Sequence, residues 1–158
     1  MRIQTAVFGE LEICQDRIIF FKEGLPGFEE LKRFVLIILE QTRPFLWLQA
    51  IDRDVAIPVI SPFEIFPHYA PVIKDDIFNE IGLQKQEDLL VLVVVVIPPE
   101  VNLMTANMAA PILINIANNQ GRQALAEDST YQIRQPIFEA VCQNLIKEER
   151  HAGSDAKE

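Results

Sequence analysis

The chain has 158 residues, of which 49% are apolar, and its 23 acidic residues against 14 basic ones give a formal net charge of −9. This length and composition suit a single domain with its own core and exclude disorder over the main body of the chain. The acidic balance argues against a nucleic-acid partner, because lysine and arginine supply most of the affinity for phosphates. The same charge keeps a protein soluble, and it also favours a basic protein partner.

The cysteines and the apolar runs bear on redox compartment and membranes. Cys14 and Cys142 are far apart and form no C-x-x-C motif, so we expect two buried or half-buried thiols and no thiolate metal site. The first residues lack the apolar region of a signal peptide, and the longest apolar run, residues 89–97, is too short to span a bilayer. We therefore expect a cytoplasmic protein with no membrane segment.

Strand signals dominate the chain from its first residues onward. Segments rich in Val, Ile and Phe alternate with clusters of Gly, Pro, Asn and Asp. Their spacing is typical of a barrel or sandwich and predicts an all-β, mainly antiparallel, small β-barrel-like single domain over residues 1–136. The expected strands are residues 3–7, 11–13, 17–21, 34–39, 45–50, 55–60, 89–97, 111–117, 122–126 and 131–134.

One connection and one strand carry special signals. Residues 24–27 read GLPG and predict a defined turn, although they match no phosphate-binding pattern. The strand at 55–60 contains Pro58, which cannot donate to a ladder, so we expect a sheet edge there. Such an edge either accepts a second chain or uses its proline to block unwanted pairing, and the sequence leaves both open.

Short helices and one long buried strand follow. We expect a helical turn at 29–32 and a helix at 74–81 that ends at Gly82. Residues 89–97 are apolar without alternation, which indicates a strand buried on both faces and covered outside by the 74–81 helix or by the C-terminal segment. We assign Phe28, Trp47 and residues 91–96 to the core, and Asn115 would need hydrogen-bond partners if buried.

The pattern changes near the C-terminus. Ile137, Val141, Leu145 and Ile146 recur at helical spacing, with Lys147 in the last turns. The sequence therefore predicts an amphipathic helix over residues 137–151 and a frayed tail over 152–158.

No set of residues indicates catalysis. His68 and His151 lie in a proline-rich stretch and near the chain end, and the acidic pairs, such as Asp75 and Asp76, point apart. Thr105 and Asn107 precede a strand and are expected to cap a loop. We expect no catalytic, cofactor or metal site, and hence a protein that is not an enzyme.

Several segments together resemble one known family. Residues 20–29 read FFKEGLPGFE and look like the F-x-x-G-L-P-G-F-E signature of the FliW flagellar assembly factors. Further matches follow in the family's order, and the ordered set is more specific than any single motif. They are FLWLQ at 45–49, TANMAAPI at 105–112, Asn115, GRQAL at 121–125 and YQIRQP at 131–136.

The chain departs from the family pattern in three places. Residues 121–123 read GRQ where Gly-x-Gln with a more β-branched continuation is usual, and Met108 and Ala109 replace a more common Leu-Leu or Leu-x pair. The helical segment after Ile137 is longer than in many relatives, which leaves the outline of a partner surface near the C-terminus open.

The resemblance implies a β-barrel-like protein without a catalytic site that binds two proteins, flagellin and the RNA-binding translational regulator CsrA. Binding CsrA would relieve its repression of flagellin synthesis, and flagellin would compete for the same protein, which we expect to be a monomer when free. From the sequence pattern we place the partner surface on the predicted edge, on the loop at 62–69 and on the loop at 103–108. Its candidate residues are Ile57, Pro58, Ile60, Phe63, Tyr69, Leu103, Met104, Asn107 and Met108.

Two other functional classes remain open on the sequence. A small β-barrel can hold a small molecule or cofactor and act as an enzyme, with Tyr69, His68 or Asn107 as its polar groups. An RNA-binding small barrel is the third hypothesis, and the net charge argues against it.

Overall fold

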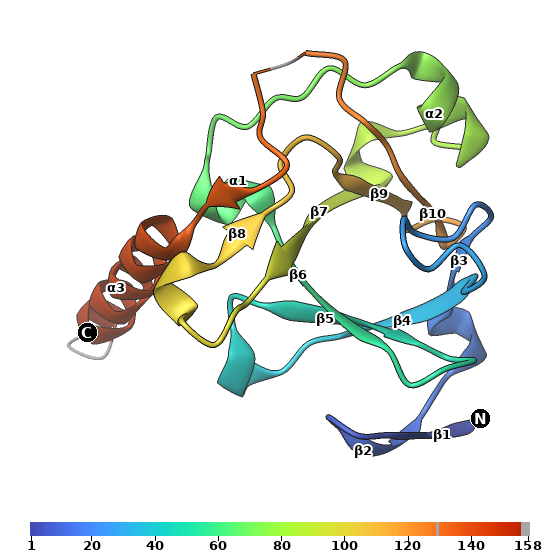
Figure 1. Ribbon diagram of the computed structural model, residues 1–158, viewed down its shortest axis with the longest axis horizontal. Coiled ribbons are helices and arrows are strands. Elements are labelled where there is room, and N and C mark those ends of the chain that lie inside the picture. Colours follow the sequence, from blue (N-terminus) through green and yellow to red (C-terminus); the bar gives the residue numbers. More distant parts are fainter. Residues whose placement is uncertain (129, 156–158) are drawn as a thin grey trace.

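The computed structural model describes residues 1–128 and 130–155, and its centre is a closed barrel of seven strands. Neighbouring strands are antiparallel except for β3 and β10, whose parallel pairing of Phe20 with Gln120 closes the barrel (Figure 1). The all-β, mainly antiparallel fold predicted from the sequence is confirmed. The barrel strands are β3 (Ile19–Phe21), β4 (Arg33–Ile37), β5 (Leu46–Ala50), β6 (Ala56–Ile60), β7 (Leu89–Val96), β9 (Ile112–Asn115) and β10 (Gln120–Gln123).

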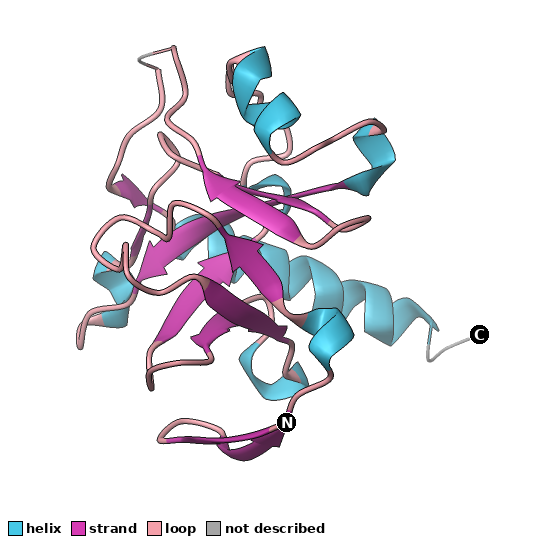
Figure 2. Ribbon diagram, turned by 90° about the vertical axis from the view of Figure 1, so that its right-hand side faces the viewer, coloured by secondary structure: helices cyan, strands magenta, loops and turns pink. Residues whose placement is uncertain are grey.

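The other elements lie outside this barrel. A hairpin, β1 (Arg2–Thr5) and β2 (Gly9–Glu12), forms a separate layer below it (Figures 1 and 2). The short strand β8 (Thr105–Ala106) pairs with β7, and β11 (Gln135–Pro136) pairs with β8. The helices are α1 (Pro62–Ile65), α2 (Asp75–Glu80) and α3 (Phe138–Asp155). Single 3-10 turns are η1 (Gln15–Arg17), η2 (Glu40–Thr42), η3 (Gln86–Asp88) and η4 (Val101–Leu103).

Strand β7 explains how the barrel acquires a second core. Leu92 and Val93 are both 0% exposed although adjacent residues of a strand face opposite sides. Leu92 packs inside the barrel, while Val93 packs outside it against Ile137 and Val141 at the start of α3. The prediction of a strand buried on both faces is confirmed, and its outer face is covered by the C-terminal segment and, around Leu89 and Val91, by residues of α2.

Two local signals in the sequence produce the structures they predict. The backbone N–H of Phe28 donates to the carbonyl of Leu25 at 2.7 Å, with Gly27 at φ +87°, which makes residues 25–28 a type II turn. Gly82, at φ +67°, ends α2, and the next N–H, of Leu83, donates back to Phe78 at 2.9 Å.

Asn115 is 2% exposed and has the partners that its burial demands. Its Nδ2 donates to the carbonyl of Ile81 at 3.0 Å, and its Oδ1 accepts from the N–H of Ala117 at 3.0 Å. The side chain thereby ties the end of α2 to the end of β9.

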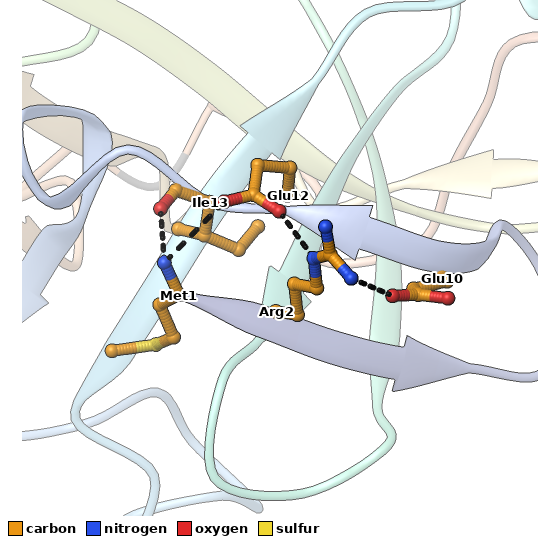
Figure 3. Close-up of polar contacts among 5 residues, drawn as sticks. All are labelled: Met1, Arg2, Glu10, Glu12 and Ile13. Atoms are coloured by element: carbon orange, nitrogen blue, oxygen red, sulfur yellow. Dashed lines mark hydrogen bonds and ion pairs between the residues drawn. The ribbon is translucent and has the colours of Figure 1, made fainter.

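The β1–β2 hairpin is an antiparallel ladder of four residue pairs, from Arg2 with Glu12 to Thr5 with Gly9, and it also carries exposed ion pairs. Arg2 pairs with Glu12 at 2.9 Å and with Glu10 at 3.5 Å across the two strands (Figure 3). Exposed pairs of this kind contribute about 0–1 kcal/mol each. Toward the barrel, the ring of Phe8 meets Trp47 edge-on, with centroids 5.7 Å apart.

The predicted sheet edge at residues 55–60 is wrong. Strand β6 pairs with β5 along Ala56–Val59 and with β7 at Val59 and Ile60, so it lies inside the barrel. Pro58 stands one residue before the pairing with β7 begins, which is a place where a missing N–H removes no ladder bond.

Other predictions of element boundaries and of burial are also wrong. Residues 131–134 form no strand; the nearby strand is β11, two residues long, and the ring of Tyr131 packs on Tyr69. Cys14 is exposed rather than buried, and Val96, assigned to the core, is 61% exposed at the end of β7. The predicted frayed tail is helical through Asp155, and its residues 156–158 lie outside those described.

Candidate partner-binding groove

The segments predicted to form a partner surface come together on one side of the barrel. Ile60, Tyr69, Met104 and Met108 all belong to the second core, the cluster that β7 shares with the start of α3. Ile60 ends β6, Tyr69 follows α1 by four residues, and Met104 and Met108 flank β8. Figure 1 shows α1 and β8 near α3. Tertiary contact thus joins two loops that are about 40 residues apart in the sequence.

Burial divides the nine candidate residues. Ile57 lies in the barrel core and Ile60, Tyr69, Met104 and Met108 lie in the second core, so these five side chains support a surface rather than form one. The side chains that reach the surface are Pro58, Phe63, Leu103 and Asn107, with Phe63 45% and Leu103 59% exposed.

Tyr69 anchors this side of the molecule. Its hydroxyl donates to the carbonyl of Met108 at 2.6 Å, and its ring meets Tyr131 edge-on with centroids 4.7 Å apart. Burial, and then the nearby Tyr131 and Asp128, raise the pKa of Tyr69 above its usual value. Tyr69 therefore stays protonated and serves as a hydrogen-bond donor that fixes the 108 loop.

Asn107 has the loop-capping role expected from the sequence. Its Oδ1 accepts the N–H of Ala110 at 3.1 Å, and its own N–H donates to Val94 at 2.9 Å. Both bonds stabilise the turn after β8. This use of its polar atoms makes Asn107 a structural residue of the surface.

Three hollows surround the chain between α1 and Tyr69 and share their walls. The first has a volume of about 360 Å³ and lies over Tyr69, Tyr131 and His68. The second has about 680 Å³ and lies between η4, β11 and the first turns of α3. The third has about 360 Å³ and lies between α1 and α3. Phe66 and Gln135 line the first and second, and Ile65, Ala140 and Gln143 line the second and third. We call this continuous depression the α1–α3 groove.

Charged groups gather at the α1 end of the groove. Asn144 of α3 donates through Nδ2 to the backbone carbonyl of Glu64 at 3.1 Å, which holds the two helices together. Glu64 and Glu148 then line a further hollow of about 220 Å³, with Arg43 opposite them. Partial burial, and then the charge of Glu148, raise the pKa of the Glu64 carboxyl, while Arg43 acts in the opposite sense.

The groove is lined by apolar side chains with a few charged and polar ones among them. Within residues 1–128 and 130–155, no three His, Cys, Asp or Glu side chains are placed to hold a metal ion. None of the helices in this part of the chain is both long and apolar enough to cross a membrane. Interaction with another protein is the chemistry that such a surface supports.

Phe66 lies within the predicted loop at 62–69, but the sequence did not single out Gln135, Ala140 and Gln143 as site residues, although they also line the groove. The one available signal was the amphipathic pattern after Ile137. Val141 of that pattern packs on the second core, whereas Leu145 and Ile146 remain exposed.

Comparison with known proteins identifies the fold and the family together. A family model described as "FliW protein" matches residues 2–137 of the chain. The chain belongs to the FliW family. This match ends one residue before α3 begins, so the C-terminal helix lies outside it.

Similar proteins and a solved structure extend over most of this FliW chain. A protein of Caldicellulosiruptor saccharolyticus named "Flagellar assembly factor FliW" is 42% identical over 146 residues, covering 92% of this chain and 95% of that protein. One of Caldicellulosiruptor bescii with the same name is 43% identical over 138 residues, covering 87% and 90%. A crystal structure of the flagellar assembly factor FliW superposes with a TM-score of 0.81 at 31% identity, covering 87% of this chain and 97% of the other.

Proposed function

We propose that this FliW-family protein is a cytoplasmic flagellar assembly factor that works by binding two proteins, flagellin and the translational regulator CsrA. Occupancy by CsrA would relieve the repression of flagellin synthesis. Occupancy by flagellin would withhold the protein from CsrA, so that secretion of flagellin frees it. Differential binding is sufficient for such a switch, and the protein is monomeric when unbound.

The observation that carries this proposal is the match to FliW over residues 2–137, together with relatives named flagellar assembly factors. Two features of the molecule support it. Its net charge of −9 favours association with a basic RNA-binding protein. The α1–α3 groove supplies a hollowed apolar surface of the kind that protein partners use.

The interior of the barrel bears on the alternative of a ligand-binding barrel. Large apolar side chains that are fully buried, among them Phe21, Phe34, Leu48 and Leu92, fill it. A small molecule would therefore have to bind in the groove outside the barrel, beside His68 and Tyr69. Mass spectrometry of the purified protein under native conditions tests this alternative, which requires a retained ligand.

Calorimetric titration of the purified protein with CsrA, with flagellin, and with each in the presence of the other tests the partner switch. The proposal expects binding to both partners and competition between them. No heat of binding with either partner at micromolar concentration would refute it. Binding without competition would remove the switch and leave two independent interactions.

A further inference from the structure

We propose that the α1–α3 groove is the docking site of the basic partner, and that Glu64 and Glu148 receive a lysine or arginine side chain whose apolar neighbours pack along α3. This inference rests on the proposed function, because it assigns the CsrA interaction to one surface of this chain. It specifies the chemistry of the docking segment: a cation flanked by apolar side chains.

The geometry places the charged and apolar parts of the groove side by side. Glu64 lines both the hollow between α1 and α3 and the hollow that contains Glu148. The first of these hollows is lined by Ile65, Ala140 and Ile146. A partner segment whose lysine or arginine pairs with Glu64 can therefore place a neighbouring apolar side chain against them.

Apolar side chains at the rim lack a cover within the described chain. Ile146 of α3 lines the hollow between α1 and α3 with Glu64 and is 50% exposed, and Ile38 lines the hollow of Glu64 and Glu148 and is 57% exposed. Covering these side chains would add apolar burial to the charge interaction.

Two basic side chains of the described residues lie near the carboxylates of Glu64 and Glu148. Arg43 lines the same hollow as both carboxylates, and its guanidinium also lies 3.5 Å from the carboxylate of Glu40. Lys147 lines the neighbouring hollow, between α1 and α3. The pKa of Glu64 is raised by burial first and by the charge of Glu148 second, and Arg43 only partly opposes this rise.

The docking segment would bind through its side chains, because the nearest strand edge is closed. Strand β11 is the last strand of its sheet and borders the groove, but its Pro136 has no N–H to offer. The carbonyl of Pro136 accepts the side-chain Nε2 of Gln135 at 3.3 Å. Addition of a strand from the partner at this edge is therefore disfavoured.

Two variants and a control test the inference by titration with CsrA at about 0.15 M salt, where the Debye length is about 8 Å. Glu64→Lys places a cation where the partner's cation would sit, and Gln143→Trp fills the groove from an exposed position. Glu87→Lys, on η3, changes the net charge by the same amount as Glu64→Lys but lies outside the groove. Circular dichroism and the unfolding midpoint show that each variant is folded.

We expect Glu64→Lys and Gln143→Trp each to weaken CsrA binding about tenfold or more, and Glu87→Lys to change it by no more than about twofold. Equal effects of Glu64→Lys and Glu87→Lys would show that only long-range attraction matters and would overturn the inference. So would unchanged binding by Gln143→Trp. In both cases the unmodified protein still binds CsrA, whereas failure of the proposed function appears as no binding by the unmodified protein itself.

Discussion

The hydroxyl of Tyr69 donates to the backbone carbonyl of Met108 at 2.6 Å, and both residues are buried. This bond fastens the loop after β8 to the segment that follows α1. It is the point at which the two loops that flank the groove are tied together.

Replacing Tyr69 with Phe should lower the free energy of unfolding by about 1–3 kcal/mol, because it removes the hydroxyl that donates to the buried carbonyl of Met108. Urea unfolding followed by Trp47 fluorescence measures the loss. Tyr131→Phe is the control, since the Tyr131 hydroxyl takes part in an exposed bond to the N–H of Ala70 and should cost less. Equal losses of unfolding free energy would show that the buried Tyr69 bond stabilises the fold no more than the exposed Tyr131 bond.

The two glycines of the 24–27 turn separate backbone strain from steric overlap. Both have positive φ, but a Cβ on Gly24 would lie 2.6 Å from the backbone oxygen of Glu29, whereas one on Gly27 would meet nothing within 4 Å. Gly27→Ala should therefore cost about 1–2 kcal/mol of unfolding free energy from strain alone. Gly24→Ala should cost clearly more or prevent folding, as thermal unfolding will show; similar melting temperatures for the two variants would contradict this.

Truncation of Leu92 tests the barrel core. Leu92 is fully buried in the barrel, and Leu92→Ala should reduce the unfolding free energy by about 2–5 kcal/mol through lost contacts and a cavity. Leu125, which is 72% exposed, gives the matched substitution Leu125→Ala, with an expected change within about 0.5 kcal/mol. Denaturant titrations of both variants make the comparison, and a small effect at Leu92 would argue against the packed interior.

Glu64 should make stability depend on pH in the direction opposite to most acidic residues. Its pKa is raised in the folded protein, by burial first and by Glu148 second, so folding disfavours its ionised form. Its contribution to stability is therefore greatest below the pKa of the unfolded chain and is lost as the pH rises through the folded-state pKa.

Glu64→Gln removes that loss and should stabilise the protein near pH 7, by less than about 1 kcal/mol because the site is partly solvated. The gain should shrink as the pH falls through the range in which Glu64 takes up its proton. Melting temperatures across this pH range, with Glu87→Gln in parallel, provide the measurement. A gain that persists unchanged in acid would contradict the assignment to Glu64.

Local sequence signals predicted local structure well. The turn at 25–28 and the end of α2 at Gly82 follow from glycines with positive φ, and the run at 89–97 predicted a strand buried on both faces. In each case the residues that determine the structure lie within a few positions of it. The fold class followed from the number and spacing of such segments.

The groove and the strand order could not be predicted in this way. Pro58 suggested an edge, but whether β6 has a second neighbour depends on β7, more than 30 residues later in the chain. Tyr131 and Ile133 suggested a strand, yet one ring packs on Tyr69 and the other side chain is exposed. Likewise Phe66, Gln135 and Ala140 become groove residues only because α3 folds back over the second core.

The parallel pairing of β3 with β10, which closes the barrel, affects folding during synthesis on the ribosome. Strand β3 ends at Phe21, but its partner β10 begins only at Gln120, so almost 100 further residues must be synthesised first. At about 5–20 residues per second this takes roughly 5–20 s. During that time the N-terminal strands of the nascent chain carry an open edge, and the barrel can close only after β10 has been synthesised.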